Sequence, residues 1–395
     1  MSDFFTQLGM PFQDSNKDYA TLDFVNFDNI GSKVNQSQFD NISIDIATTI
    51  DKYSLQIIQN PELVDSLGYP KEITNHMDSN LVAMRLGYVV DINGKPILIE
   101  TNSQTPSFWW ECETGTDKVL GNYNKMRNPS YYGNLQNCLK SEIKNLHKNN
   151  KDNKNLKPNI GLVTCDSEDD IFQMTFIKNC LSSLQISDHT EILTINRMDI
   201  STDNKVFSLN TDKEFDILLF WYPIEWLVND IFVDGTKVFE RLFELVKDNK
   251  IQIFNGMQSF LAQNKNLLAY ITEIQDTIHP NIAPTFYTLK EFENSQNGND
   301  WIGKPIFGRE GKGIFGKQNG KDISGDCDDE YYNNQWYVYQ PFIQTMPLIW
   351  NKKAYDFTLE KWVYKIDNVW QVGGQSLRIS TNQIIDNKSK WLSIN

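Results

Sequence analysis

The chain has 395 residues and carries a formal net charge of -14 at pH 7. This length favours two or three packed subdomains over one small core. Its content of 40% hydrophobic and 12% aromatic residues excludes a globally disordered protein. The acidic balance disfavours a nucleic-acid partner, because phosphate contacts need clustered Lys and Arg.

Two further features of the sequence limit the compartment in which the protein works and the chemistry that it can use. No apolar run approaches the ~18 to 20 residues of a membrane span, and the start "MSDFFTQLGMPFQDSNKDY" lacks the pattern of a signal peptide. We therefore expect a cytoplasmic protein with no membrane partner. The five cysteines are scattered without C-x-x-C spacing, and none has a neighbouring His, which argues against a disulfide framework, a structural zinc site or a nucleophilic cysteine.

The first predicted elements are a helix and a hairpin. Apolar residues recur at helical spacing over 34–60, which predicts an amphipathic helix. In 81–102, the strand-like segments "RLGYVV" and "PILIETN" flank "DINGK", and its Asn-Gly pair is a strong hairpin signal. Glu100 and Asn102 then point to the same face of the second strand, with Arg85 on its partner.

Strands and helices alternate through the middle of the chain. After a Lys- and Asn-rich helix end and loop at 140–157, "NIGLVTCD" and "FDILLFWYP" read as buried strands. They predict an α/β lobe with a partly parallel sheet. The remaining elements predicted for this part are helices at 169–184, 236–248 and 259–274 and the short strand "IQIFNG".

The last hundred residues change character again. The segments "WIGKPIFG", "GIFGKQNG", "WYVYQPFI" and "YDFTLEKWVYKIDNVWQVGGQSLRIS" read as strands separated by turns. They predict a mainly antiparallel sheet. A helix–strand lobe followed by a sheet with a glycine-rich loop is typical of an α+β module that grips a nucleotide.

Two oxygen-bearing side chains form a candidate metal site. Glu100 and Asn102 on one strand face suit a hard cation such as Mg²⁺, which takes carboxylate and carbonyl oxygens. The alternative is an ordinary solvent-facing strand, since alternation alone often produces such pairs.

The glycine-rich segment "KPIFGREGKGIFG" at 304–316 is a candidate phosphate site. Lys304 ends an apolar strand, and a buried ammonium needs either a carboxylate partner or the phosphates of a nucleotide. The loop that follows would supply backbone N–H groups to phosphate oxygens. A hairpin turn explains the same glycines, so the segment leaves both readings open.

Two more charged groups stand out. In "WYPIEW" at 221–226, Glu225 lies among aromatic residues, where it is either an exposed acid or a carboxylate that faces an amine. In "GGQSLRIS", Arg378 is either half of a structural ion pair or a cation that steadies negative charge during acyl transfer.

In order along the chain, these segments resemble the synthetase part of the glutathionylspermidine synthase family, an ATP-grasp family. Arg85 followed by "LIETNSQTPSFWWE" is similar to the family's Arg, Glu-x-Asn-x-x-Thr-Pro-Ser/Thr and Glu. The segment "WYPIEW" is similar to Tyr-Pro-x-Glu-Trp. The other matching segments are "NGMQSFLAQNKNLL", "IGKPIFGREG", "YVYQPF" and "GGQSLRISTNQIIDNKSKW".

The resemblance implies a fold and a division of the chain. It implies an ATP-grasp fold of α+β and α/β type, with a preceding pre-ATP-grasp α/β lobe and a mainly antiparallel C-terminal sheet. It also implies three regions: an N-terminal region at 1–145 that carries the metal-binding hairpin, an α/β lobe at 155–250, and a nucleotide-binding lobe at 251–395 that includes 81–115.

The resemblance also implies a reaction. ATP would activate a substrate carboxylate as an acyl phosphate, and an amine would then attack it to give an amide, ADP and phosphate. Glutathione and spermidine are the type substrates, so a peptide-like acid and a polyamine or other amine are the expected partners. The expected cofactors are ATP and Mg²⁺.

Site roles follow from the matched positions. Glu100 and Asn102 would hold Mg²⁺, while Arg85 and Arg378 would contact the acyl phosphate. Thr105 and Ser107 would bind the acid, and Glu225 would face the amine. The residues implied for ATP are Lys265, Lys304, Gly308, Arg309, Gly311, Gln340, Gln383, Ile384 and Ile385.

Two departures from the family pattern bear on activity. The family has Arg-x-Asp with a metal-ligating Asp where this chain has Arg85-Leu86-Gly87. Asp91 and Glu111 are possible substitutes by nearness in sequence, and weaker metal binding or lost turnover are the other outcomes. The segment "SFWWE" is more apolar than in glutathione-using members, which leaves the acid substrate open.

Three functions are compatible with these features of the sequence. An ATP-dependent carboxylate–amine ligase explains the ordered motifs best. A nucleotide-binding protein without turnover is the alternative that Gly87 motivates. An interaction protein that uses its aromatic surface is the third, and it predicts no nucleotide-dependent change in stability.

Overall fold

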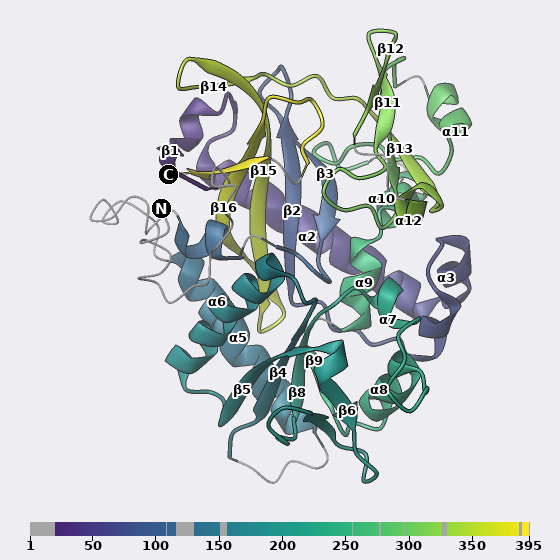
Figure 1. Cartoon of the computed structure of the whole chain (residues 1–395). Helices are drawn as coiled ribbons and strands as arrows, with labels where there is room; N and C mark the ends of the chain where they lie inside the picture. The colour runs from purple at the N-terminus through teal and green to yellow at the C-terminus, as the bar shows by residue number, and fades with distance from the viewer. Residues whose placement is uncertain are drawn as a thin grey trace.

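The largest sheet of the molecule joins strands from both ends of the chain (Figure 1). The structure, a computed structural model, describes residues 20–107, 109–115, 130–150, 156–254, 256–275, 278–295, 297–325, 330–386 and 389–394. The sheet runs in the order β1-β17-β16-β15-β2-β3, with β14 paired to β15. Its strands are β1 Ala20–Val25, β2 Ala83–Val90, β3 Pro96–Asn102, β14 Leu348–Trp350, β15 Lys353–Ile366, β16 Val369–Ser380 and β17 Lys390–Ile394.

The predicted hairpin is confirmed as β2 and β3. The Asp91 carboxylate accepts the N–H groups of Asn93 and Lys95, and the following Gly94 has a φ of 77°. Beyond the turn, a register shift between Gly87 and Tyr88 places Arg85 opposite Asn102 and Gly87 opposite Glu100. Directly paired residues point to the same face of a sheet, so these four positions share one face.

The predicted amphipathic helix is α2, Gln36–Gln59, which packs against β15 and β16. Asn35 caps its first turn, because the Asn35 side chain accepts the N–H of Gln38 and the Gln38 side chain accepts the N–H of Asn35. Phe39 on its buried face meets the ring of Tyr88 edge-on. Helix α2 therefore covers the face of β2 opposite to Arg85 and Gly87.

The predicted α/β lobe is confirmed, and its sheet is entirely parallel. The strands run β5-β4-β8-β9, and the residues of β8 are all buried, as expected of a parallel strand covered on both faces. The strands are β4 Asn159–Thr164, β5 His189–Thr194, β8 Ile217–Trp221 and β9 Gln252–Phe254, beside the small pair β6 Met198–Ile200 and β7 Val206–Ser208. The helices of this part are α5 Ser130–Asn149, α6 Glu168–Leu184, α7 Ile224–Leu227 and α8 Val238–Lys247.

A third sheet carries the glycine-rich segment. Its four strands run β12-β11-β10-β13 and all pair antiparallel, which confirms the prediction for this part of the chain. It lies beyond the β3 edge of the large sheet (Figure 1). The strands are β10 Trp301–Pro305, β11 Phe315–Gln318, β12 Lys321–Ser324 and β13 Tyr337–Pro341, and the neighbouring short helices are α3 Glu62–Ser66, α11 Leu289–Asn294 and α12 Glu330–Asn333.

The single helix predicted at 259–274 is wrong. The structure has two helices, α9 Met257–Gln263 and α10 Asn266–Ile274. The Asn264 side chain accepts the N–H of Asn266, while the N–H of Lys265 donates to the carbonyl of Ile306. The break therefore follows from a contact with the loop after β10, which apolar periodicity does not reveal.

Tryptophans join the large sheet to the α/β lobe. Trp109 packs on Trp221 at a ring distance of 4.6 Å and on Trp362 at 4.8 Å. Trp110 packs on Trp391, and Phe108 lies outside the described residues. The two described tryptophans of "SFWWE" therefore belong to the core and line neither of the cavities described below, which removes them as an argument about the acid substrate.

Gly374 on β16 lies against the backbone of the π-helical turn Glu111–Gly115. A Cβ at this position would lie 1.9 Å from the carbonyl oxygen of Cys112. We expect Gly374→Ala to lower the free energy of unfolding by about 2 to 3 kcal/mol, measured by urea denaturation. Gly133→Ala on α5 is the control: a Cβ there meets no atom within 4 Å, so stability should rise by about 0.5 to 1 kcal/mol.

No helix in the described part of the chain is both long and apolar enough to cross a membrane.

Candidate active site

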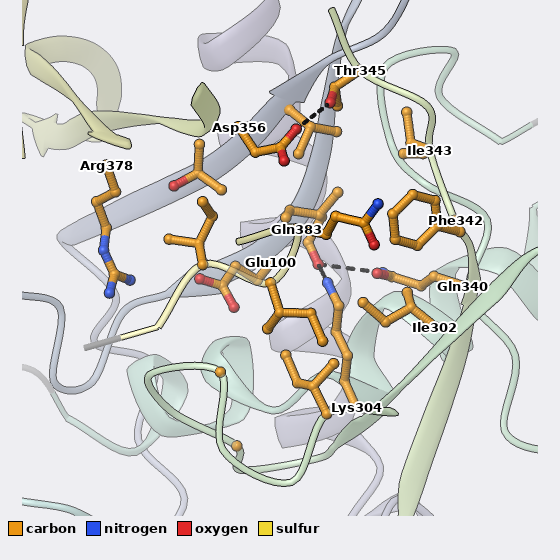
Figure 2. Close-up of a pocket in the computed structure, with 18 of the residues that line it drawn as sticks. Glu100, Ile302, Lys304, Gln340, Phe342, Ile343, Thr345, Asp356, Arg378 and Gln383 are labelled. Atoms are coloured by element: carbon orange, nitrogen blue, oxygen red, sulfur yellow. Dashed lines mark hydrogen bonds between the residues drawn. The ribbon is translucent and has the colours of Figure 1, made fainter. Parts of the chain in front are cut away.

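A cavity of ≈ 270 Å³ lies between the third sheet and the β3 edge of the large sheet (Figure 2). Strands β3, β10, β13 and β15, the loop at 306–314 and the segment at 383–385 form its walls. It brings together eight of the nine residues predicted to bind ATP. These are Lys265, Lys304, Gly308, Gly311, Gln340, Gln383, Ile384 and Ile385.

The polar end of this cavity holds two lysines and one glutamate. The Nζ of Lys265 lies 3.9 Å from the Glu100 carboxylate and donates to the carbonyl oxygen of Gly308 at 2.8 Å. The Nζ of Lys304 donates to the carbonyl oxygen of Ile99 at 3.3 Å. Both lysines are buried, so the cavity holds two cations largely removed from water.

The protonation of these groups follows from burial and from their neighbours. Burial lowers the pKa of Lys304 to about 8; Glu100 opposes this shift and Lys265 adds to it. Burial alone would raise the pKa of Glu100, but Lys265, Lys304 and Arg85 outweigh it and lower that pKa to about 2. Glu100 is therefore a carboxylate at neutral pH, and Lys304 is positive but close to its titration range.

An apolar wall lies beside Lys304, whose Nζ shares the carbonyl oxygen of Ile99 with the Gln340 amide. Ile302, Phe342 and Ile343 line it together with Gln340 (Figure 2). The Gln340 amide donates to the hydroxyl of Thr285 at 2.9 Å, while its buried oxygen accepts no hydrogen bond from the described residues. An unsatisfied acceptor in an apolar slot fits a planar ligand that presents an N–H group, as adenine does.

The loop at 306–314 separates this cavity from a second one. Gly308, Glu310 and Lys312 line both cavities. Glu310 has a φ of 55°, and Gly311 has a φ of 73°. A Cβ on Gly311 would lie 2.7 Å from the carbonyl oxygen of Ile385, so glycine lets the loop pack on the segment at 383–385.

The second cavity, of ≈ 330 Å³, gathers most of the residues predicted for substrate and chemistry. Arg85, Asn102, Thr105, Ser107 and Arg378 line it, and Glu100 and Arg378 face both cavities. Three acidic residues in these walls were not predicted, because their positions along the chain show no motif: Asp169 and Asp170 in the second cavity and Asp356 in the first. Glu310 and Lys312 of the glycine-rich segment line both cavities, although no role was predicted for either.

Arg309, predicted to bind the cofactor, lines only the second of the two cavities. Its guanidinium forms an ion pair with Glu225, donates to the hydroxyl of Thr105 at 2.8 Å and lies 5.7 Å from the ring centre of Trp226. The buried Glu225 carboxylate is therefore already paired, and its side chain does not line the cavity. A role in amine binding would have to involve Arg309 as well.

The two arginines predicted to contact an acyl phosphate lie in the same cavity but are held differently. Arg378 donates to the carbonyl oxygen of Asp386 at 2.7 Å. Arg85 forms a buried ion pair with Glu360 on β15. Glu360 was not among the predicted residues, because its pairing with β2 joins segments far apart in the sequence.

The donor set fits a magnesium ion that is completed by phosphate oxygens. Glu100 is charged and Asn102 donates its amide to Glu100 at 3.3 Å, which places the Asn102 oxygen in the same region. Among the described residues, no group of three or more His, Cys, Asp or Glu side chains is placed to hold a metal. Mg²⁺ commonly binds one or two protein carboxylates plus phosphates and keeps several waters.

Neither acid suggested in place of the missing Asp lies beside Gly87. Asp91 accepts hydrogen bonds in the hairpin turn, at the other end of β2. Glu111 lines the second cavity and accepts from the Gln173 amide at 3.0 Å, and burial raises its pKa to about 7. A buried carboxyl group whose pKa is raised in this way is a weaker ligand for a cation than an ordinary carboxylate.

Residues 23–394 match the glutathionylspermidine synthase pre-ATP-grasp family. The chain belongs to this family. The match confirms the resemblance predicted from the motifs and supports a ligase related to glutathionylspermidine synthase.

Two individual proteins are similar to this family member. A Haemophilus influenzae protein named "Putative acid--amine ligase" is 26% identical over 208 residues. That match covers 51% of this chain and 47% of the relative, so the chain spans about half the length of that curated protein. The structure of a glutathione synthetase-like effector from Globodera pallida, in its apo form, aligns with a TM-score of 0.60 at 9% identity, covering 99% of this chain and 94% of that one. This likeness confirms the ATP-grasp type of fold.

Proposed function

We propose that this family member is an ATP-dependent carboxylate–amine ligase that forms an amide through an acyl phosphate. The observation that carries the proposal is the pair of buried lysines facing Glu100, at the point where two cavities meet. A structural ion pair would need one lysine for one carboxylate. The second buried cation calls for further negative charge, which the phosphates of ATP would supply.

The first cavity would hold ATP. The apolar wall beside Gln340 would take the adenine, and Lys265 and Lys304 would bind the phosphates. Glu100 and Asn102 would hold Mg²⁺, which neutralises phosphate charge when it is bound. The loop at 306–314 would cover the phosphates and keep water from the acyl phosphate.

The second cavity would hold the acid and the amine. The substrate carboxylate oxygen would attack the γ-phosphorus and release ADP. The amine nitrogen would then attack the carbonyl carbon, lose a proton and expel phosphate. Arg85 and Arg378 would stabilise the negative charge that forms on the transferred group, and Thr105 and Ser107 would orient the acid.

The charged residues of the second cavity support the substrate classes expected from the family. A peptide-like acid such as glutathione fits the arginine side, and a polyamine or other amine fits the acidic side with Asp169 and Asp170. The net charge of -14 would favour the approach of a cationic amine.

The experiment that tests this function is a thermal unfolding assay with ATP and Mg²⁺, followed by a phosphate-release screen of acid and amine pairs. A ligand at ~100 times its dissociation constant should stabilise the fold by about 2.7 kcal/mol. Phosphate release that requires both an acid and an amine would support the ligase. Absence of any shift at millimolar MgATP would refute it.

The second candidate is an ATP-binding protein of the same fold that has lost turnover, and Gly87 is the observation that favours it. It predicts the same thermal shift. No acid and amine pair would then increase phosphate release above the background of the protein with ATP alone.

A further inference from the structure

Three directly paired positions on neighbouring strands of the large sheet surround Arg85. Glu360 on β15 lies directly opposite Gly87 on β2, and Gly87 lies directly opposite Glu100 on β3. Arg85 precedes Gly87 by two residues, so it points to the same face of the strand. The row therefore places one glutamate on each side of a position that has no side chain.

The absence of a side chain at Gly87 allows the two glutamates to approach each other. A Cβ on Gly87 would be 2.9 Å from the Cγ of Glu100 and 3.6 Å from the nearer carboxylate oxygen of Glu360. The space that a side chain at 87 would take is thus occupied from both sides. An aspartate there would displace Glu100 or push Glu360 away from Arg85.

Both carboxylate oxygens of Glu360 have partners in this region. One of its carboxylate oxygens pairs with the Arg85 guanidinium, and the other accepts the hydroxyl of Thr358 at 2.8 Å. Both Glu360 and Arg85 are buried. Glu360 does not line either of the two cavities, whereas Arg85 lines the second. Glu360 therefore lies behind Arg85 as seen from that cavity.

Arg85 also faces a competing anion. Glu100 lies on the same face of the sheet, two positions along β3 from Asn102, the residue directly opposite Arg85. Without Glu360, the guanidinium would be drawn toward Glu100 and the phosphate end. Such a shift would place the Arg85 guanidinium over the Glu100 carboxylate, which is needed to bind magnesium. The guanidinium would then no longer lie where the transferred phosphoryl group would be bound.

We propose that Glu360 is the positioning residue of Arg85, and that Gly87 leaves the space in which this pair forms. The inference rests on the proposed function for the step that Arg85 serves. In this family member, the acid beside Arg85 comes from β15 and binds the arginine, so the side chains left to bind magnesium here are Glu100 and Asn102.

The first test observes Arg85 directly and needs no substrate. The chain has six arginines, so protein labelled with ¹⁵N-arginine gives few guanidinium signals, assigned by Arg→Lys variants. A held guanidinium rotates slowly and shows separate Nη signals. In Glu360→Gln, the Arg85 signals should merge, while those of Arg309, held by Glu225, should persist. Separate Arg85 signals in Glu360→Gln would overturn the proposal.

The second test separates positioning from a merely structural ion pair. Glu113→Gln is the matched control, because Glu113 is a buried glutamate that accepts from Tyr364 and Gly374 and lines neither cavity. With an acid and amine pair found by phosphate release, Glu360→Gln should lower kcat by about 100-fold with an unchanged KM for ATP. Glu113→Gln should change neither constant, although both variants lose stability. An equal kcat in the two variants would refute the proposal.

The outcomes also distinguish failure of this inference from failure of the proposed function. If MgATP gives no thermal shift in the wild type, the ligase function fails, and the Arg85 signals still decide whether Glu360 holds the guanidinium. In the other case, MgATP stabilises the wild type and Glu360→Gln equally, while the Arg85 signals merge only in the variant. Nucleotide binding is then independent of the positioning of Arg85 by Glu360, as proposed.

Discussion

Replacing Lys304 with methionine should weaken ATP binding by about 10- to 100-fold, because it removes a charged hydrogen bond to phosphate worth about 1.5 to 3 kcal/mol. Methionine fills a similar volume, and the variant buries one charge fewer, so the fold should hold. The measurement is isothermal titration with ATP and Mg²⁺. Lys317→Met on the same sheet is the control, because Lys317 is exposed and lines neither cavity, and it should bind ATP like the wild type.

The same lysine predicts a pH dependence. Phosphate binding favours the protonated amine, so it should raise the pKa of Lys304 above its value of about 8 in the free protein. ATP affinity should therefore be highest below pH 8 and fall as the pH rises above it, with proton uptake on binding near pH 8.5. Titrations in buffers of different ionisation enthalpy measure that uptake. Equal affinity for Lys304→Met and wild type, or no proton uptake, would show that Lys304 does not contact the phosphates.

Replacing Glu100 with glutamine should both destabilise the protein and remove its response to magnesium. The change leaves Lys265 and Lys304 buried without their shared anion, which should cost about 2 to 3 kcal/mol of unfolding free energy, since Glu100 is partly exposed. Urea denaturation measures the loss. Titration of ADP with and without Mg²⁺ measures the second effect, and in the variant the two affinities should be equal.

The stability difference should also depend on pH in a defined direction. The pKa of Glu100 falls from an ordinary value of 4.5 to about 2 in the folded protein. The stabilisation is therefore complete above pH 4.5 and is lost as the pH falls toward 2. Wild type and Glu100→Gln should converge in this window. Glu214→Gln, an exposed change, is the control, and a constant difference down to pH 2 would contradict the role given to Glu100.

The parts of the site that follow from local sequence could be predicted. The Asn-Gly turn predicts the hairpin, and the alternation along its second strand places Glu100 and Asn102 on one face before the fold is known. That Arg85 shares this face depends on a register shift between Gly87 and Tyr88, which the turn does not indicate. Lys304 could be placed at the end of a strand and the glycines after it in the following loop, because they are adjacent in sequence. The structure then brings eight of the nine predicted ATP residues to one cavity.

The parts that depend on distant segments could not be predicted. Glu360 lies in the strand-like segment "YDFTLEKWVY", and nothing in that segment indicates that β15 pairs with β2. The break at Asn264 and Lys265 depends on the carbonyl of Ile306, some forty residues later. Arg309 belongs to the glycine-rich loop in sequence, but its contacts with Thr105 and Glu225 turn it toward the second cavity. The division of the chain into three regions stays a prediction.

The shared wall between the two cavities links their occupants. Gly308, Glu310 and Lys312 face both sides, and Arg309 and Lys265 tie the same loop to the second cavity and to α10. A molecule that orders this loop from one side must change the binding free energy on the other, and thermodynamics makes the effect equal in both directions. Under the proposed function, ADP would have to leave before the phosphate and the amide, because those two would be retained for as long as ADP kept the loop in place.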